Sequence, residues 1–303
     1  MGDTPSLAPG IHHGIPEADY HALPYFSASA AKALSQSCPA QYRYDTDNPS
    51  ERDPTREMEI GSVADILTLD PAAFADSVLV VDGAAWQGKD RQEKRALAYA
   101  NGMTPILSAD LEKCMAMRDA LKAQVGDLFE GGHAQVVMVW DDPALKLRCK
   151  ARIDYVRADG WDIDYKTTKD PSPTAFRRRV SDNGHHIQMA MYQAGREILT
   201  GRRPKWLWLV QSTDAPYLAC GYEGTEVWRH LGMSAAMRAA EIFRACTESG
   251  EWWGYQHQFQ PLPDPPSYAL FDHEAAEEAH KVIRPKLDKA LDQTMRAWQA
   301  PNS

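Results

Sequence analysis

The segment from Lys150 to Thr168 constrains the fold of this chain more than any other part of its sequence. Two strand-like runs, residues 145–155 and 161–167, flank the short segment Arg157-Ala-Asp-Gly160. Glycine and aspartate between two such runs are typical of a tight turn, so the segment predicts an antiparallel β-hairpin.

The predicted hairpin brings three charged side chains together. If the turn is centred near Asp159, Asp154 and Asp164 lie opposite each other, with side chains about 5 Å apart. The two-residue period of a strand then places Lys166 on the same face as Asp164. Like charges directly opposite each other destabilise a sheet, and a cation between them relieves the repulsion. A hard ion such as Mg²⁺, which uses carboxylate and water ligands, suits this arrangement.

The overall composition is that of a globular protein. A chain of 303 residues with 44% hydrophobic residues can form one large or two small domains with an ordinary core. We expect a cytoplasmic location and no membrane association, because the sequence shows neither an eighteen-residue apolar run nor a signal-peptide pattern. The cysteines are scattered without a C-x-x-C spacing, which argues against a disulfide framework or a zinc site.

The formal net charge of −9 is weak evidence about nucleic-acid binding. It argues against a protein coated in nucleic acid, but a nuclease needs only a local basic groove. Two basic clusters, Arg177-Arg178-Arg179 and Arg202-Arg203, occur near the predicted site. Each is consistent with a DNA contact or with an ordinary solvated surface.

The pattern along the chain predicts an α/β protein. Residues 1–25 suggest an extended or poorly ordered arm, with order beginning at Ser27, where Ser27 or Ser29 can cap a helix. Residues 84–104 suggest a loop with a partial helix. Further helices are expected over 30–36, 40–44, 58–69, 108–129, 185–199, 226–249 and, after a Pro-rich linker, 273–299, and strands over 135–140, 145–155, 161–167, 205–211 and 217–222.

Four motifs in this order resemble the PD-(D/E)xK nuclease superfamily, in particular its RecB-type and RecE-like exonucleases, the latter including exodeoxyribonuclease VIII. The strand order with acids on the second and third strands and a lysine two residues after the last acid is the layout of that superfamily. The matching segments are Ser27 to Tyr42, Gly61 to Pro71, Trp161 to Pro173, and His185 to Tyr192 with its Gln-x-x-x-Tyr pattern. Together they extend from about residue 25 to 222.

The resemblance implies a restriction-endonuclease-like core, a mixed central sheet flanked by helices, over residues 26–259, with a linker and helix over 260–303. It implies that Asp154 and Asp164 bind Mg²⁺ or Mn²⁺ and that Lys166 positions the attacking water. Gln188 and Tyr192, four residues apart, can face the same phosphate or orient Lys166. The candidates for DNA contact are Ser27, Ser29, His186 (or His185 beside it), Arg177, Arg178 and Arg179.

Two positions depart from the family pattern. The histidine of the Gly-x-x-x-His helix is replaced by Asp65, and the acid expected on the first strand is replaced by Gln135. Asp65 can serve as a hard-metal ligand. Gln135 can coordinate only through its carbonyl or hold a water, and Glu130 can substitute for it only if the strand register differs.

The function that the resemblance implies is metal-dependent resection of double-stranded DNA ends, 5′ to 3′, for recombination by annealing in a phage or prophage. A homo-oligomeric ring of three or four subunits and a single-strand annealing partner are expected with it. Two alternatives stay open: a structure-specific or restriction-type endonuclease, and a catalytically weakened DNA-binding subunit that retains the fold.

Overall fold

The computed structural model describes residues 6–48 and 54–255, and six isolated positions further on, Asp264, Glu274, Glu277, Glu278, Lys281 and Arg284. The chain divides into two compact units, Met1–Tyr255 and Gln256–Ser303. The predicted Pro-rich linker and final helix lie, apart from those positions, outside the described residues. The description below concerns the first unit.

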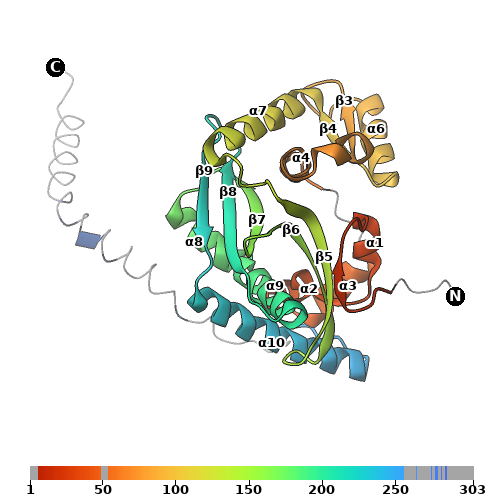
Figure 1. Cartoon of the computed structure of the whole chain (residues 1–303), viewed down its shortest axis with the longest axis vertical. Helices are drawn as coiled ribbons and strands as arrows, with labels where there is room; N and C mark the ends of the chain where they lie inside the picture. Colours follow the sequence, from red (N-terminus) through yellow and green to blue (C-terminus); the bar gives the residue numbers. More distant parts are fainter. Residues whose placement is uncertain are drawn as a thin grey trace, which may run out of the picture. The chain divides into compact units, whose positions relative to one another are not determined.

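A seven-stranded mixed sheet forms the centre of this unit (Figure 1). The strand order is β1-β5-β6-β7-β8-β9, with β2 beside β6. β7 and β8 are parallel, as are β2 and β6, and the other pairs are antiparallel. The strands are β1 Gly10–His12, β2 Phe26–Ser27, β5 Gly132–Asp142, β6 Leu147–Arg157, β7 Trp161–Thr168, β8 Lys205–Ser212 and β9 Ala219–Glu223.

Helices cover both faces of the sheet and form two large cores, besides a small cluster around Tyr20. The larger core joins α2 (Ala28–Gln36), α9 (His185–Thr200) and α10 (Glu226–Ser249) to the sheet around buried Trp140, Trp206 and Trp208. The second joins α4 (Arg56–Leu69) and α7 (Ser108–Val125) to the sheet around Ile163 and Tyr165. Figure 1 shows α4 and α7 at one end of the view and α10 at the other. The predicted α/β architecture, a mixed sheet flanked by helices, is confirmed.

Local sequence signals account for the main helix boundaries. Ser27, Thr55 and Thr225 accept a backbone N–H at the starts of α2, α4 and α10, which satisfies a donor that has no partner inside the helix. Gly201 and Gly250 end α9 and α10 in the left-handed conformation. Residues 226–249 form the long helix that the sequence predicts.

Several smaller elements were not predicted. β3 (Val78–Val81) and β4 (Thr104–Leu107) form a separate parallel pair next to α6 (Lys89–Ala100). α8 (Pro173–Asp182) begins at a Ser-Pro cap that the sequence does carry. The other short elements without a prediction are α1 Glu17–Ala22, η2 Pro71–Ala73 and α5 Phe74–Ser77, whereas α3 Pro39–Asp47 contains the helix predicted over 40–44. No helix within the described ranges has the length and apolar character needed to cross a bilayer.

The expectation that order begins at Ser27 is wrong. β1 adds an antiparallel strand to β5, and α1 packs through Tyr20 against Val137 and Val139. The buried Lys150 of β6 donates from Nζ to the carbonyl oxygens of Tyr20, His21 and Leu23 at 2.9, 3.0 and 2.6 Å. A cation at the last turn of a helix satisfies its free carbonyls. The sequence places Lys150 in a predicted strand, but its contact with the N-terminal segment was not predicted.

Lys150→Met is expected to lower the free energy of unfolding by about 3 kcal/mol, because three carbonyl acceptors lose a charged donor in a buried place. Urea denaturation of the variant and the parent measures the difference. Lys122→Met, at an exposed position on α7, is the control and should change stability by less than about 0.5 kcal/mol. Equal stability of the two variants would show that Lys150 does not anchor α1.

Candidate active site

At the site, β5 and β6 depart from the regular alternation of side chains between the two faces of the sheet. On β5, Val136 packs in the core shared with α2, α9 and α10, whereas Ala134, two residues earlier, packs against the α4 and α7 core. Gln135 between them has a left-handed φ of +53°, and the ladder register places it opposite Asp154 of β6. Left-handed backbone interrupts the alternation of a strand. Glu130, which is exposed, is therefore not the substitute for the missing acid.

The β6–β7 hairpin has the predicted register. Tyr155 pairs with Ile163, so Asp154 stands opposite Asp164 about a turn that includes Asp159. Regular pairing ends at this point, because the Asp154 carboxylate, through Oδ2, accepts the backbone N–H of Tyr165 at 2.9 Å. The two acids thus lie where the strands separate.

Lys166 bridges the two carboxylates. Its Nζ is 2.7 Å from Asp164 Oδ1 and 3.7 Å from Asp154 Oδ2, and it also donates to the Tyr165 carbonyl at 3.3 Å. Burial alone would lower the pKa of Lys166, but the Asp164 and Asp154 charges outweigh it and raise that pKa. Burial raises the pKa of Asp154 to about 6 against the opposing effect of Lys166. The predicted grouping of these three side chains is confirmed.

α9 and α2 supply a second layer of contacts to Asp164. Gln188 donates from Nε2 to Asp164 Oδ1 at 2.7 Å, and Lys32 of α2 donates from Nζ to Gln188 Oε1 at 3.0 Å. Burial, with the nearby Lys166 charge, lowers the pKa of Lys32 to about 8. Lys32 was not predicted. The available signal was a single lysine within the alanine-rich sequence of α2.

Asp65 and Gln135, the two departures from the family pattern, contact each other. Gln135 donates from Nε2 to Asp65 Oδ2 at 2.8 Å. Burial, together with the Asp154 charge, raises the pKa of Asp65 well above its usual range. α4 can approach β7 this closely because Gly61 has no side chain. A Cβ at that position would lie only 3.2 Å from Thr167 Oγ1. The small residue predicted to admit another backbone therefore helps to place Asp65.

The oxygen donors fit a hard divalent ion. Asp164 Oδ2 is buried without a hydrogen-bond partner, and Asp154 and Asp65 add two further carboxylates nearby. Mg²⁺ is commonly held by one or two carboxylates and several waters. Among the described residues, no three His, Cys, Asp or Glu side chains form a ready-made metal cluster. Metal binding here therefore relies on few protein ligands, with Asp154 and Asp164 the first candidates.

Tyr192 and His186 are less directly placed. Tyr192 is 7% exposed and packs edge-on against Trp206 in the larger core. His186 Nδ1 lies 2.9 Å from the Val180 carbonyl oxygen, and its ring packs against Trp228, so it contacts α8 and α10. His185 lies nearer the acids, and burial lowers its pKa to about 3. The roles of Tyr192 and His186 stay predictions.

The candidate DNA contacts are mostly accessible. Arg177, Arg178 and Arg179 are exposed on α8, and no acid in the described part of the chain lies within ion-pairing distance of them. Ser29 is exposed, whereas Ser27 caps α2 by accepting the Ala30 N–H at 3.2 Å. Their contact with DNA is a prediction that the fold permits.

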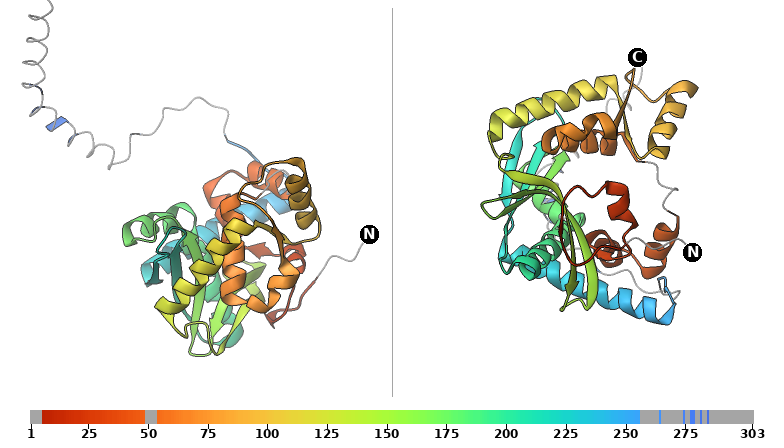
Figure 2. Two further views of the ribbon diagram at one scale, coloured as in Figure 1. Left: turned by 90° about the horizontal axis from the view of Figure 1, so that it is seen from above. Right: turned by 45° about the vertical axis from the view of Figure 1, so that its right-hand side comes forward.

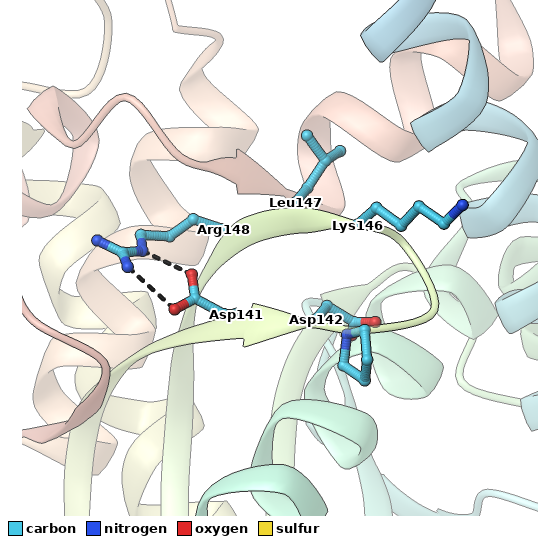
Figure 3. A pocket seen from close by; sticks show the side chains of 6 residues that line it. Asp141, Asp142, Lys146, Leu147 and Arg148 are labelled. Carbon is cyan, nitrogen blue, oxygen red and sulfur yellow. Dashed lines mark hydrogen bonds and ion pairs between the residues drawn. The ribbon is translucent and has the colours of Figure 1, made fainter.

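A pocket of about 350 Å³ at the β5–β6 turn lies apart from this site (Figure 3). It is lined by the turn itself, and Arg148 pairs with Asp141 through two contacts of 2.7 and 2.9 Å. The Arg148 guanidinium is therefore satisfied by its neighbour on the adjacent strand.

The sheet, with acids on two adjoining strands, a lysine two residues after the second acid and a glutamine helix above them, defines a PD-(D/E)xK-type fold. The chain belongs to the family described as "PDDEXK-like domain of unknown function (DUF3799)", whose profile matches residues 27–257. Proteins of this fold typically use divalent metals, and the family indicates a nuclease. No curated protein matches the chain.

One solved structure supports the fold. It is described as a "Putative exonuclease" from Eubacterium rectale, is 13% identical, covers 80% of this chain and 90% of its own, and has a TM-score of 0.54. A second, described as SSO0001, is 12% identical over 73% of this chain and 86% of its own, with a TM-score of 0.28. The first structure shares the fold of this chain, whereas the similarity to the second structure is too low to indicate a shared fold.

Proposed function

We propose that this protein is a Mg²⁺- or Mn²⁺-dependent DNA exonuclease of the RecE type. The observation that carries the proposal is the Lys166 ammonium held at 2.7 and 3.7 Å between the Asp164 and Asp154 carboxylates, beside the unpartnered Asp164 Oδ2. Phosphodiester hydrolysis requires a nucleophile at neutral pH and compensation of the charge that develops on the phosphate. Carboxylates with a neighbouring ammonium provide groups that can meet both requirements.

Each residue has a task that follows from its contacts. Asp154 and Asp164 would hold the metal, which when bound lowers the pKa of water and polarises the phosphate. Lys166 holds the attacking water and stabilises negative charge on the phosphate. Gln188 fixes Asp164 through its 2.7 Å hydrogen bond, and Lys32 fixes Gln188. The exposed arginines of α8 supply positive charge for the DNA backbone.

Digestion of two substrates separates exonuclease from endonuclease. An exonuclease degrades a linear duplex in Mg²⁺ or Mn²⁺ and leaves a covalently closed circle intact. Cleavage of the closed circle would favour the structure-specific or restriction-type endonuclease instead. Strand-specific end labels then test the proposed 5′ to 3′ direction, and light scattering tests the proposed ring of three or four subunits. An annealing partner is proposed with them.

Gln135 is the observation that favours the second candidate, a catalytically weakened DNA-binding subunit. Where the family has an acid, Gln135 instead donates to Asp65, so one negative charge is missing beside the carboxylates. A reduced site still binds DNA but cleaves it slowly. No loss of linear duplex in either metal, with duplex binding retained, would establish this candidate.

Gln135→Glu is expected to lower the melting temperature in EDTA, because two carboxylates then face each other, and to regain most of the loss in Mn²⁺. The cleavage rate in Mn²⁺ should rise or stay equal. Gln41→Glu is the matched control, since exposed Gln41 also donates to an aspartate, Asp45, at 2.9 Å. Equal losses for both variants in EDTA and in Mn²⁺ would show that no ion binds next to Gln135.

A further inference from the structure

Arg152 is a cation of the site that neither the sequence motifs nor the proposed mechanism uses. It lies on β6 two residues before Asp154. Burial raises the pKa of Asp154 and of Asp65, and the Arg152 charge opposes that rise at both acids. Its side chain is 19% exposed, and its Nε is buried without an acceptor.

The partner of Arg152 is an exposed acid from the N-terminal segment. Arg152 Nη1 lies 3.2 Å from Glu17 Oε2, and the Glu17 side chain is 70% exposed. Among the described residues, Glu17 is the one carboxylate within ion-pairing distance of Arg152. A guanidinium has five N–H donors in a planar fork, so Arg152 retains donors that a second acceptor can use.

A half-buried arginine on a helix that packs against the sheet shows the contrast. Arg196 of α9 pairs with Asp162, whose side chain is 0% exposed, so no external ligand can replace that partner without disrupting the core. Glu17 is open to solvent, and ion pairs with exposed carboxylates are weak. A phosphate, which binds the arginine fork through two oxygens, can therefore replace Glu17.

The N-terminal segment holds Glu17 at this position. Glu17 is the first residue of α1, and the carbonyls at the other end of α1 are fixed by Lys150, two residues before Arg152 on β6. One strand therefore anchors the helix and presents the arginine that the helix contacts. The right-hand view of Figure 2 shows the red N-terminal segment beside the strands of the sheet, in agreement with the pairing of β1 with β5.

We propose that Arg152 binds a backbone phosphate of the DNA strand beside the metal-binding carboxylates, and that Glu17 occupies its guanidinium until DNA replaces it. The inference rests on the proposed function and adds a substrate-binding residue to it. Glu17 then sets the affinity for DNA, because each binding event must break the Glu17–Arg152 pair. It also favours polyanions over isolated weak anions, since only a ligand held at several points competes with a tethered carboxylate.

The test measures binding of a fluorescein-labelled blunt duplex in Ca²⁺ by anisotropy, over a range of salt concentrations. Glu17→Gln should bind about three- to fivefold more tightly than the parent. Arg152→Met should bind about tenfold more weakly, with a salt slope reduced by about one, as for the loss of one phosphate contact. Arg152→Lys should lie between, since it keeps the charge but loses the fork.

Two further variants distinguish a specific effect from a general change of charge. Asp119→Asn removes a similarly exposed carboxylate that pairs with Arg118 on α7, and should leave binding within twofold of the parent. In the Glu17→Gln/Arg152→Met double variant the gain should vanish. Melting temperatures confirm that each variant is folded, and Arg152→Lys carries the test if Arg152→Met is not.

The possible failures are distinguishable. Unchanged binding by Glu17→Gln, or a gain that persists in the double variant, overturns the role of Glu17. Unchanged binding by both Arg152 variants overturns the phosphate contact while the proposed nuclease function stands. A parent protein that binds no duplex in Ca²⁺ overturns both the proposed function and this inference.

Discussion

Asp164→Asn is expected to lower the rate of DNA cleavage by about 10³-fold, because it removes the charge of a carboxylate that we propose binds the metal. The fold should persist. Asparagine keeps the size of this 2% exposed side chain. Its carbonyl can still accept from Gln188 and Lys166, both of which donate to Asp164 Oδ1 in the parent protein. The measurement is the initial rate of release of nucleotides from a linear duplex in Mg²⁺, with the melting temperature measured in parallel.

Asp159→Asn is the control for this variant. Asp159 lies in the turn of the same hairpin, is exposed and pairs with Arg157, so it shares the local backbone but not the site. It should retain the parent rate within about twofold. A folded Asp164→Asn protein with the parent's rate would exclude Asp164 as a metal ligand.

Lys166→Met is expected to have two large effects. The cleavage rate should fall by about 10²- to 10⁴-fold, because the variant lacks the ammonium that we propose holds the attacking water and stabilises charge on the phosphate. In EDTA the free energy of unfolding should fall by about 3 kcal/mol, because the buried Asp164 and the neighbouring Asp154 lose the ammonium with which both form ion pairs. Urea denaturation in EDTA and in Mg²⁺ measures the second effect.

The stability loss should depend on metal and on pH. Mg²⁺ supplies a replacement cation, so it should stabilise Lys166→Met more than the parent. Asp154 already has its pKa raised to about 6, and removal of Lys166 raises it further. A group with a raised native pKa stabilises the fold when protonated and loses that contribution as pH rises through the native value. The loss should therefore be larger at pH 8 than at pH 5, and a pH-independent loss would contradict the bridging role of Lys166.

The core of the site could be predicted from sequence because its geometry is local. A turn centred at Asp159 and the two-residue period of strands are enough to place Asp154 opposite Asp164 and Lys166 on the face of Asp164. Gln188 was also placed correctly, because the resemblance supplied a helix position that local spacing alone does not.

The rest of the site depends on contacts between distant segments. Lys32 reaches the site through Gln188, which is 156 residues away in sequence, and Arg152 meets Glu17 only because the N-terminal segment packs on β6. No periodicity encodes such pairs. Tyr192, one helical turn beyond Gln188, packs in the larger core, and its role at the site stays a prediction.

The fold was predicted best where elements are long. The helix over 226–249 and the hairpin strands have clear periods and end signals. β3 and β4, at four residues each, are too short to show a period. The polar N-terminal segment suggested little order, because the bonds that hold α1 come from Lys150, 127 to 130 residues away. Tertiary contacts outweighed local composition there.

The most direct test of the account is digestion of an end-labelled linear duplex by the parent protein in Mg²⁺, in Mn²⁺ and in EDTA, with Asp164→Asn alongside. We predict progressive loss of DNA from the ends in at least one metal, no loss in EDTA and none with the variant. Intact DNA in both metals, from a folded protein that binds the duplex in Ca²⁺, would contradict the claim that Asp154, Asp164 and Lys166 form a working nuclease centre.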